Sequence, residues 1–296
     1  MRHGGIDRRE VATGGRGVEN RRPERMTAKR YHRVLTIAGS DSGGGAGIQA
    51  DIKTFSALGC YGMSAITAVT AQNTRGVRAI HPLPTPMIRA QIDAIFDDMG
   101  ADATKIGMLY SAELIETVAL ALKRHGAKNI VLDPVMDAES GTKLLHDQAI
   151  HVIKKLLLPL AAIVTPNLPE ASKLSGRRIR DSKDMREAAR TIASFGSRSV
   201  LIKGGHGDDK GCNDLLFLAP EDRFVLFEGE RIATKNNHGT GCTLSSAIAS
   251  FLAMGYSVEG AVESAKAYVT GAIKAGAEYE IGGGKGPVHH LFRSWR

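Results

Sequence analysis

The chain has 296 residues, of which 43% are hydrophobic and 24% charged, as expected for a globular protein with a large buried core. No apolar run is long enough to cross a bilayer, and the N-terminus lacks the hydrophobic segment of a secretory signal. We therefore expect neither a membrane protein nor a secreted one. The three cysteines show no C-x-x-C spacing, which favours a cytoplasmic protein without a disulfide framework or zinc site.

Most of the net charge of +8 lies in residues 1–30, which contain nine Lys or Arg and four Asp or Glu. This polar, glycine-rich segment cannot pack a core, so we expect a disordered basic extension ahead of a single domain over residues 31–296. Met26 as the true first residue, or a tail that binds nucleic acid, are the alternatives. Because little net charge remains beyond residue 30, nucleic acid is not an expected partner of the domain.

From residue 33 onward, short apolar runs alternate with segments of helical periodicity. The predicted elements are a strand over 34–38, a helix over 48–58, a strand over 63–69, a helix over 86–99, a strand ending at 108, a helix over 112–124, a strand over 130–132, a helix over 147–157, a strand over 162–165, a short helix after 167, a helix over 183–195, a strand over 200–203, strands near 214–218 and 223–228, and helices over 241–253 and 258–275. This alternation predicts an α/β fold with a mostly parallel sheet and helices on both faces. Ligands of such sheets bind at the carboxyl ends of the strands, so candidate residues follow the strands.

The sharpest local signal is the segment His-Gly-Thr-Gly-Cys-Thr over 238–243, which opens a predicted helix. Its glycines would let the backbone approach a ligand, and the free N–H groups of Gly239, Thr240 and Gly241 could stabilise a phosphoryl anion. A glycine-rich turn with a structural cysteine is the plainer alternative. Cys242 lies in the first helical turn, where a thiol pKa tends to fall. It could accept a substrate proton or only shape the anion pocket.

Another glycine cluster, over 43–47, follows the first predicted strand, and we call it the first glycine cluster because it comes first in the chain. It formally matches a dinucleotide-binding fingerprint, which requires an acidic residue about twenty positions later to bind the ribose. No Asp or Glu occurs between Asp51 and Asp93, so the dinucleotide interpretation fails. The chain also lacks a G-x-x-x-x-G-K-[ST] segment, which excludes a P-loop enzyme.

Two polar residues close to this cluster could bind a heterocyclic substrate. Asp51 lies in the first helix on the turn nearest the glycines, although a solvated helix carboxylate is the plainer interpretation. Gln72 follows an apolar strand, and its primary amide offers a paired donor and acceptor. The edge of an aminopyrimidine presents the complementary pair.

Four residues at other strand ends could bind ATP and magnesium. Asp133, Asn167 and Glu170 offer the oxygen ligands that Mg²⁺ prefers, and Lys203 stands ahead of two glycines where it could meet a phosphate. Asn167 and Glu170 are also what a simple helix cap requires, and Lys203 could be an ordinary strand-end lysine.

Together these segments resemble the hydroxymethylpyrimidine/phosphomethylpyrimidine kinases of thiamine biosynthesis, which belong to the ribokinase-like superfamily. The resemblance covers residues 33–296. Its most specific segments are 38–41, 47–51, 71–74, 105–108, 165–171, 203–206, 238–242 and 286–290. It implies a three-layer ribokinase-like fold, ATP with Mg²⁺, a homodimer, and two successive phosphorylations that convert 4-amino-5-hydroxymethyl-2-methylpyrimidine to its monophosphate and then to its diphosphate.

The resemblance also implies roles for individual residues. Asp51 and Gln72 match side chains that bind the pyrimidine, and the pocket would be lined by Gly39, Met108 and Val135. Residues 239–242 match the anion hole. The assignment of Asp133 and Glu170 to the magnesium ion rests on their residue types and positions alone.

One position departs from the family pattern. Relatives often carry a lysine near the start of the loop that follows the Asp133 strand, whereas this chain has Glu139, which would not help to hold phosphate. The nearest alternative function is a pyridoxal or pyridoxine kinase of the same fold, and Gln72 favours the pyrimidine. A non-catalytic pyrimidine-binding protein would require loss of the phosphate-binding residues, all of which are present.

Overall fold

The computed structural model describes Met1 and residues 29–137, 147–204 and 212–295. Residues Tyr31–Arg296 form one compact unit. Most of residues 1–30 lie outside the described part, so the disordered tail stays a prediction, and Glu139 lies outside it as well. Among the helices of the described segments, none is both long and apolar enough to cross a membrane.

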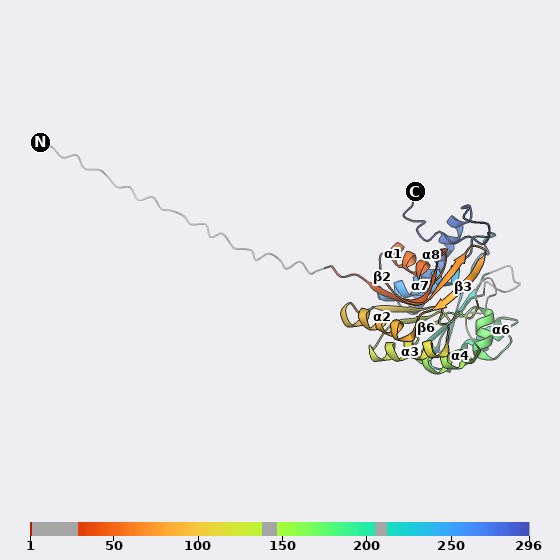
Figure 1. Cartoon of the computed structure of the whole chain (residues 1–296). Helices are drawn as coiled ribbons and strands as arrows, with labels where there is room; N and C mark the ends of the chain where they lie inside the picture. Colours follow the sequence, from red (N-terminus) through yellow and green to blue (C-terminus); the bar gives the residue numbers. More distant parts are fainter. Residues whose placement is uncertain (2–28, 138–146, 205–211, 296) are drawn as a thin grey trace. The chain divides into compact units, whose positions relative to one another are not determined.

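Within the described residues, nine strands form one sheet in the order β3-β2-β1-β4-β5-β6-β7-β8-β9 (Figure 1). The strands are β1 Arg33–Asp41, β2 Tyr61–Asn73, β3 Gly76–Pro82, β4 Ala103–Ile106, β5 Ile130–Leu132, β6 Ile163–Val164, β7 Ser199–Ile202, β8 Asp214–Leu218 and β9 Arg223–Phe227. The six central strands are parallel to one another, in the sheet order β2-β1-β4-β5-β6-β7. At the two edges, β3 pairs antiparallel with β2, and β8 and β9 add antiparallel pairs after β7. The predicted mostly parallel sheet is confirmed.

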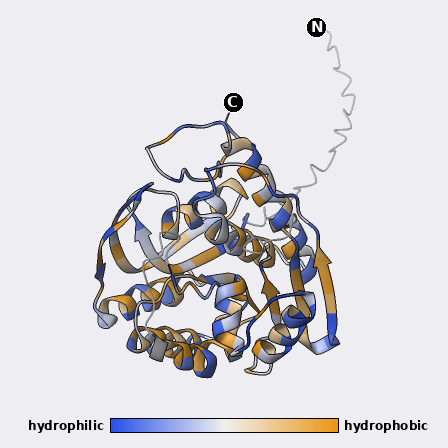
Figure 2. Cartoon of the chain, turned by 90° about the vertical axis from the view of Figure 1, so that its right-hand side faces the viewer, coloured by the Kyte–Doolittle hydropathy of each residue, from blue (hydrophilic) through white to orange (hydrophobic). Residues whose placement is uncertain are grey.

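Helices cover both faces of this sheet and complete three layers. On one face lie α1 Gly47–Ala57, α7 Thr240–Ala253 and α8 Val258–Gly276. On the other lie α2 Thr85–Asp98, α3 Ala112–Arg124, α4 Asp147–Val152, α5 Leu168–Ser175 and α6 Ser182–Ala193. The strands between the layers are mostly hydrophobic, and hydrophilic segments gather on the outside (Figure 2). The predicted three-layer α/β fold is confirmed.

The burial of the central strands explains why the sequence shows them so clearly. Every residue of β4, β5, β6 and β7 is buried, because helices cover both faces of these strands. Strands buried on both faces appear as short continuous apolar runs rather than alternating ones. The carboxyl ends of the parallel strands consequently meet at one edge, next to the start of α7.

The structure corrects three predicted elements. The predicted helix over 147–157 is α-helical only to Val152 and continues as a π-helix over Ile153–Leu157. β2 extends to Asn73 rather than ending at residue 69, so Gln72 lies inside the strand and pairs with Val77. Its partner β3 was missed, because this edge strand is only partly buried and lacks a clear apolar run.

Candidate active site

The start of α7 packs against the first glycine cluster. Gly239, the residue before the helix, has a φ of +81°, and a Cβ at this position would overlap the carbonyl oxygen of Gly45. A Cβ at Gly45 would in turn lie 2.5 Å from Cδ2 of His238. Since only glycine fits at these two positions, the two glycine clusters form one continuous surface. We call residues 238–242 the anion loop.

A buried ion pair lies beneath the anion loop. Asp51 and Lys105 are both fully buried, and Lys105 Nζ lies 3.0 and 2.9 Å from the two carboxylate oxygens. Thr36 Oγ1 donates to the same carboxylate at 2.6 Å, and Ser246 Oγ of α7 donates at 2.7 Å. The interpretation of Asp51 as a solvated helix carboxylate is therefore wrong. Its carboxylate accepts four hydrogen bonds from the protein and ties α1 to α7.

The sequence alone singles out Lys105 only as part of the segment 105–108 and indicates no role for it. Burial alone would lower its pKa, but the surrounding acidic groups, Asp51 first among them, together outweigh burial and raise the pKa of Lys105. The lysine is thus charged at neutral pH inside the protein. A lysine within the apolar run of β4 was the signal that could have revealed it.

The residues predicted to line the pyrimidine pocket lie together at the ends of β1, β4 and β5. A Cβ at Gly39 would lie 2.6 Å from Cε of Met108, so Gly39 lies directly against the end of the Met108 side chain. Met108 and Val135 belong to one small apolar cluster, which also includes Ala68. This cluster offers an apolar surface beside Gly39.

Gln72 belongs to a polar network that joins β1, β2 and the anion loop. Its Nε2 lies 3.3 Å from His238 Nε2, and its Oε1 lies 3.2 Å from Thr70 Oγ1. His238 Nε2 also lies 3.1 Å from Oδ2 of Asp41. Burial opposes ionisation of Asp41, but hydrogen bonds from His238 and from the Ala46 and Gly43 amides outweigh it and lower the pKa of Asp41. Sequence reasoning assigned no role to Asp41 or His238.

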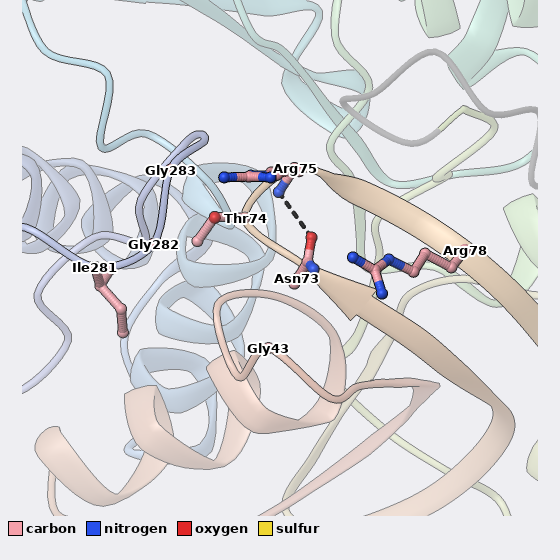
Figure 3. A pocket seen from close by; sticks show the side chains of 8 residues that line it. All are labelled: Gly43, Asn73, Thr74, Arg75, Arg78, Ile281, Gly282 and Gly283. Atoms are coloured by element: carbon pink, nitrogen blue, oxygen red, sulfur yellow. Dashed lines mark hydrogen bonds between the residues drawn. The ribbon is translucent and has the colours of Figure 1, made fainter.

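A cavity of about 430 Å³ opens next to this network (Figure 3). Arg75 and Arg78, from the turn between β2 and β3 and from β3 itself, line one side, and Ile281, Gly282 and Gly283 line the other. Gly43, from the first glycine cluster, and Asn73 and Thr74, which follow Gln72, complete the lining. Both arginines are exposed, and no ion pair joins either of them to an acid within the described residues. The cavity therefore carries positive charge.

Asp133 and Lys203 lie on the other side of the anion loop. Lys203 Nζ donates to Asp133 Oδ1 at 3.0 Å, and Ser245 Oγ of α7 donates to Asp133 Oδ2 at 3.2 Å. A Cβ at Gly241 would lie 3.5 Å from Lys203 Nζ and 3.9 Å from Asp133 Oδ2. The positive end of α7 and the ammonium group of Lys203 thus lie around one place, which suits a phosphate.

Asn167 and Glu170 form a reciprocal cap at the start of α5. The Asn167 side chain accepts from the Glu170 amide at 2.9 Å, and Glu170 Oε2 accepts from the Asn167 amide at 2.7 Å. The helix-cap interpretation is therefore confirmed. Glu170 is nevertheless buried, and its Oε2 lies 4.0 Å from Lys203 Nζ, so the cap also faces the phosphate side of the site.

The residues predicted for the substrate and for the phosphate lie close together in the folded chain. His238 of the anion loop contacts Gln72, and Ser246 in the second turn of α7 bonds to Asp51. Residues 41–289 match the model of the phosphomethylpyrimidine kinase family. The chain belongs to this family.

Two relatives that are named as kinases of this family match over nearly their whole length. The hydroxymethylpyrimidine/phosphomethylpyrimidine kinase of Rhizobium meliloti is 52% identical over 264 residues, which cover 89% of this chain and 98% of the relative. The crystal structure of phosphomethylpyrimidine kinase from Clostridium difficile matches with 47% identity and a TM-score of 0.73, covering 81% of this chain and 99% of that one. The predicted family is confirmed.

A pyridoxal kinase has a similar structure. The Bacillus subtilis pyridoxal kinase in complex with ADP matches with a TM-score of 0.82 and 39% identity, and the match covers 90% of this chain and all of that one. The predicted ribokinase-like fold is confirmed. This likeness also shows that the phosphomethylpyrimidine kinase fold is shared with enzymes named for another substrate.

The carboxylates on the phosphate side of the site fit a magnesium ion that is bound together with nucleotide phosphates. Within the described residues, no group of three or more His, Cys, Asp or Glu side chains could hold a metal ion by itself. Magnesium usually binds through one or two carboxylates, phosphate oxygens and waters. The two carboxylates of Asp133 and Glu170, both close to Lys203, are compatible with that kind of site.

Glu170 provides a pH test of this arrangement. Burial raises the pKa of Glu170 from its ordinary 4.5 to about 7. Between these values the folded chain keeps a proton that the unfolded chain has lost, so the free energy of unfolding falls as the pH rises. We expect the melting temperature of the magnesium-free protein to fall more steeply between pH 4.5 and 7 than that of Glu170→Gln. If the melting temperatures of the two proteins changed with pH in parallel, the raised pKa of Glu170 would be contradicted.

The expected fall in the pKa of Cys242 is wrong. Burial raises the pKa of this thiol to about 11, and the carboxylates of Asp51 and Asp133 add to the rise. The positive charge of Lys105 and a backbone hydrogen bond from Gly47 act in the opposite direction and do not compensate. At neutral pH Cys242 is therefore a neutral thiol within the anion loop.

Proposed function

We propose that this chain is an ATP-dependent kinase of thiamine biosynthesis. It would phosphorylate 4-amino-5-hydroxymethyl-2-methylpyrimidine to the monophosphate and then to the diphosphate. The observation that carries this proposal is the contact between Gln72, which suits a pyrimidine, and His238 of the anion loop, which suits a phosphate. The Rhizobium meliloti relative, which carries both kinase names, supports the two successive steps.

The pyrimidine would lie on the apolar cluster of Met108 and Val135, beside Gly39. Gln72 would pair with the polar edge of the ring, since its amide offers both a donor and an acceptor. In this arrangement Asp51 acts from beneath the site. Its hydrogen bond from Ser246 holds α7 in place, and direct contact with the substrate would require its buried bonds to rearrange.

The phosphate side would act mainly by positioning and by stabilising charge. The amides of Gly239, Gly241 and Cys242 would face the phosphoryl group as it moves to the substrate, and Lys203 would bind the phosphates of ATP. The Thr240 amide, which the sequence suggested as a further donor, instead donates to the Asn237 carbonyl oxygen at 3.2 Å. Asp133 and Glu170 would hold magnesium, which would neutralise part of the charge on the triphosphate. Since Cys242 carries a neutral thiol, it shapes the anion loop and is not a ready base at neutral pH.

The positive cavity beside Gln72 supports a substrate that becomes an anion after the first step. Charged groups at the entrance of a site raise the association rate of oppositely charged ligands. Arg75 and Arg78 would therefore attract the monophosphate more strongly than the neutral pyrimidine.

Replacing Gln72 with Ala tests the pocket assignment. We expect the KM for the hydroxymethylpyrimidine to rise by roughly 10- to 100-fold, because two hydrogen bonds to a partly buried ring edge are lost. The KM for ATP should stay within about twofold, since the Gln72 side chain bonds to Thr70 and His238 and not to Lys203 or Asp133. Steady-state kinetics with each substrate varied in turn would measure both constants. An unchanged KM for the pyrimidine would show that Gln72 does not bind it.

Pyridoxal phosphorylation is the second candidate, favoured by the structural likeness to the Bacillus subtilis enzyme. A coupled assay that offers both substrates to the purified protein separates the two functions.

We further propose that residues 31–296 form the single catalytic domain. The enzyme would act as a homodimer in the cytoplasm and would not bind nucleic acid. Light scattering on the purified protein would give its oligomeric state.

A further inference from the structure

The terminal amide of Gln72 is flanked by two groups that constrain its orientation. One end of the amide lies 3.3 Å from His238 Nε2, and the other lies 3.2 Å from Thr70 Oγ1. The oxygen and nitrogen of an amide have nearly the same shape, so their positions follow from the hydrogen bonds that each neighbour can make. As placed, Nε2 faces His238 and Oε1 faces Thr70.

His238 requires an acceptor. Its Nε2 lies 3.1 Å from the Asp41 carboxylate, which is 3% exposed and also accepts from the backbone amides of Gly43, Gly45 and Ala46. A carboxylate held by three amides is ionised and can only accept, so Nε2 of His238 must carry a proton. A protonated nitrogen has no lone pair for a second donor. The amide atom that faces His238 is therefore favourable only as the carbonyl oxygen.

Thr70 requires a donor, for an independent reason. Its hydroxyl lies 2.9 Å from the backbone carbonyl oxygen of Ser40, to which it donates its single proton. Toward Gln72 the Thr70 oxygen can then only accept. The amide atom that faces Thr70 is favourable only as the NH₂ group. Both neighbours thus demand the same orientation, with oxygen toward His238 and nitrogen toward Thr70.

We propose that His238, held by Asp41, and Thr70 lock the Gln72 amide in this orientation, and that the lock selects a 4-aminopyrimidine over a 4-oxopyrimidine. The proposal rests on the proposed function. His238 and Thr70 are positioning residues that act through Gln72.

The shape of the substrate agrees with this orientation. On the ring, the 4-amino group is next to the carbon that bears the hydroxymethyl group, and N3 is one atom further away. With the hydroxymethyl group toward the anion loop, the 4-amino donor lies on the His238 side and meets the Gln72 oxygen. The N3 acceptor then lies on the Thr70 side and meets the Gln72 NH₂ group. A 4-oxo ring has the reverse pattern, an acceptor at position 4 and a donor at N3, so both contacts become repulsive.

A neutron crystal structure of the ligand-free full chain in deuterated solvent tests the lock directly. We expect two deuterons on the Gln72 amide atom that faces Thr70, and one deuteron on Nε2 of His238. Deuterons on the amide atom that faces His238 would overturn the proposal, whatever the activity of the protein. This result does not depend on the proposed function.

Kinetics test the consequence for selectivity. The measured quantity is the ratio of kcat/KM for the 4-amino substrate to that for 5-hydroxymethyl-2-methyl-4-oxopyrimidine. We expect a ratio of at least about 100 for the wild type, and a fall of about tenfold in the ratio for Thr70→Val and for His238→Phe, since each loses one of the two constraints. Thr70→Ser keeps the hydroxyl group and should keep the wild-type ratio within about twofold.

The ratio separates the lock from general damage to the site. A loosened site would lower both rates in parallel and leave the ratio unchanged, so an unchanged ratio in both Thr70→Val and His238→Phe would overturn the proposal. If the wild type phosphorylates neither pyrimidine, the proposed function fails, and the neutron structure still decides the orientation of the amide.

Discussion

Replacing Lys105 with Met is expected to lower the free energy of unfolding by about 3–5 kcal/mol. Lys105 and Asp51 are both fully buried, and the substitution would leave the Asp51 carboxylate without its positive partner inside the protein. Thr36 and Ser246 would still donate to that carboxylate, which places the loss toward the lower end of this range. Urea unfolding at pH 7, followed by circular dichroism, would measure it.

Two further variants give this result its meaning. Lys274→Met makes the same change at an exposed ion pair, 3.8 Å from Glu230, and should cost less than about 1 kcal/mol. The double variant Lys105→Met with Asp51→Asn removes the buried charge altogether and should recover a large part of the stability lost in Lys105→Met. A single variant as stable as the wild type would show that the buried ion pair contributes little.

Replacing Gly239 with Ala is expected to reduce kcat by at least about 100-fold. A methyl group there would overlap the carbonyl oxygen of Gly45, and an alanine at a φ of +81° is strained in addition. The anion loop would have to move away from the first glycine cluster. Removal or misplacement of one donor that stabilises a developing anion costs about 10²- to 10³-fold in rate. Steady-state kinetics at saturating ATP and substrate would show the fall.

Gly255→Ala is the matched control for this experiment. Gly255 follows α7 at its other end and has a φ of +90°, but a Cβ there would meet nothing within 4 Å. This variant should lose about 1 kcal/mol of stability from backbone strain and keep its kcat. Equal kcat values in Gly239→Ala and the wild type would mean that the packing of the two glycine clusters has no part in catalysis.

Those parts of the fold that are buried on both sides were predictable from the sequence. The runs 130–132 and 200–203 predicted strands close to β5 and β7, because helices cover both faces of these strands and every residue there is apolar or buried. The alternation of such runs with helical periodicity then predicted the parallel sheet. The edge strand β3 was missed, because its side chains are only partly buried and the apolar pattern is weak.

At the candidate site, the sequence predicted which residues come together better than it predicted their partners and their depth of burial. Asp133 follows β5 and Lys203 follows β7, two parallel strands on either side of β6. The rule that the carboxyl ends of parallel strands meet at one edge therefore predicted correctly that the two residues lie close together. The partner of Asp51 was not predictable, since Lys105 is 54 positions away and its burial depends on how α7 covers both residues. The pKa of Cys242 was wrongly predicted for the same reason. The helix start favours the thiolate, but the depth of burial is set by the whole fold and outweighs it.

The anion loop and the residue that follows it also bond to the C-terminal segment. The His238 amide donates to the Gly286 carbonyl oxygen at 3.0 Å, and Thr243 Oγ1 lies 3.1 Å from His290 Nε2. One small site therefore draws on residues from β1, near the beginning of the compact unit, and on residues near its end. No short fragment of the chain contains the site. Recombination that exchanges part of this unit between homologues must therefore preserve contacts between segments that are far apart in the sequence.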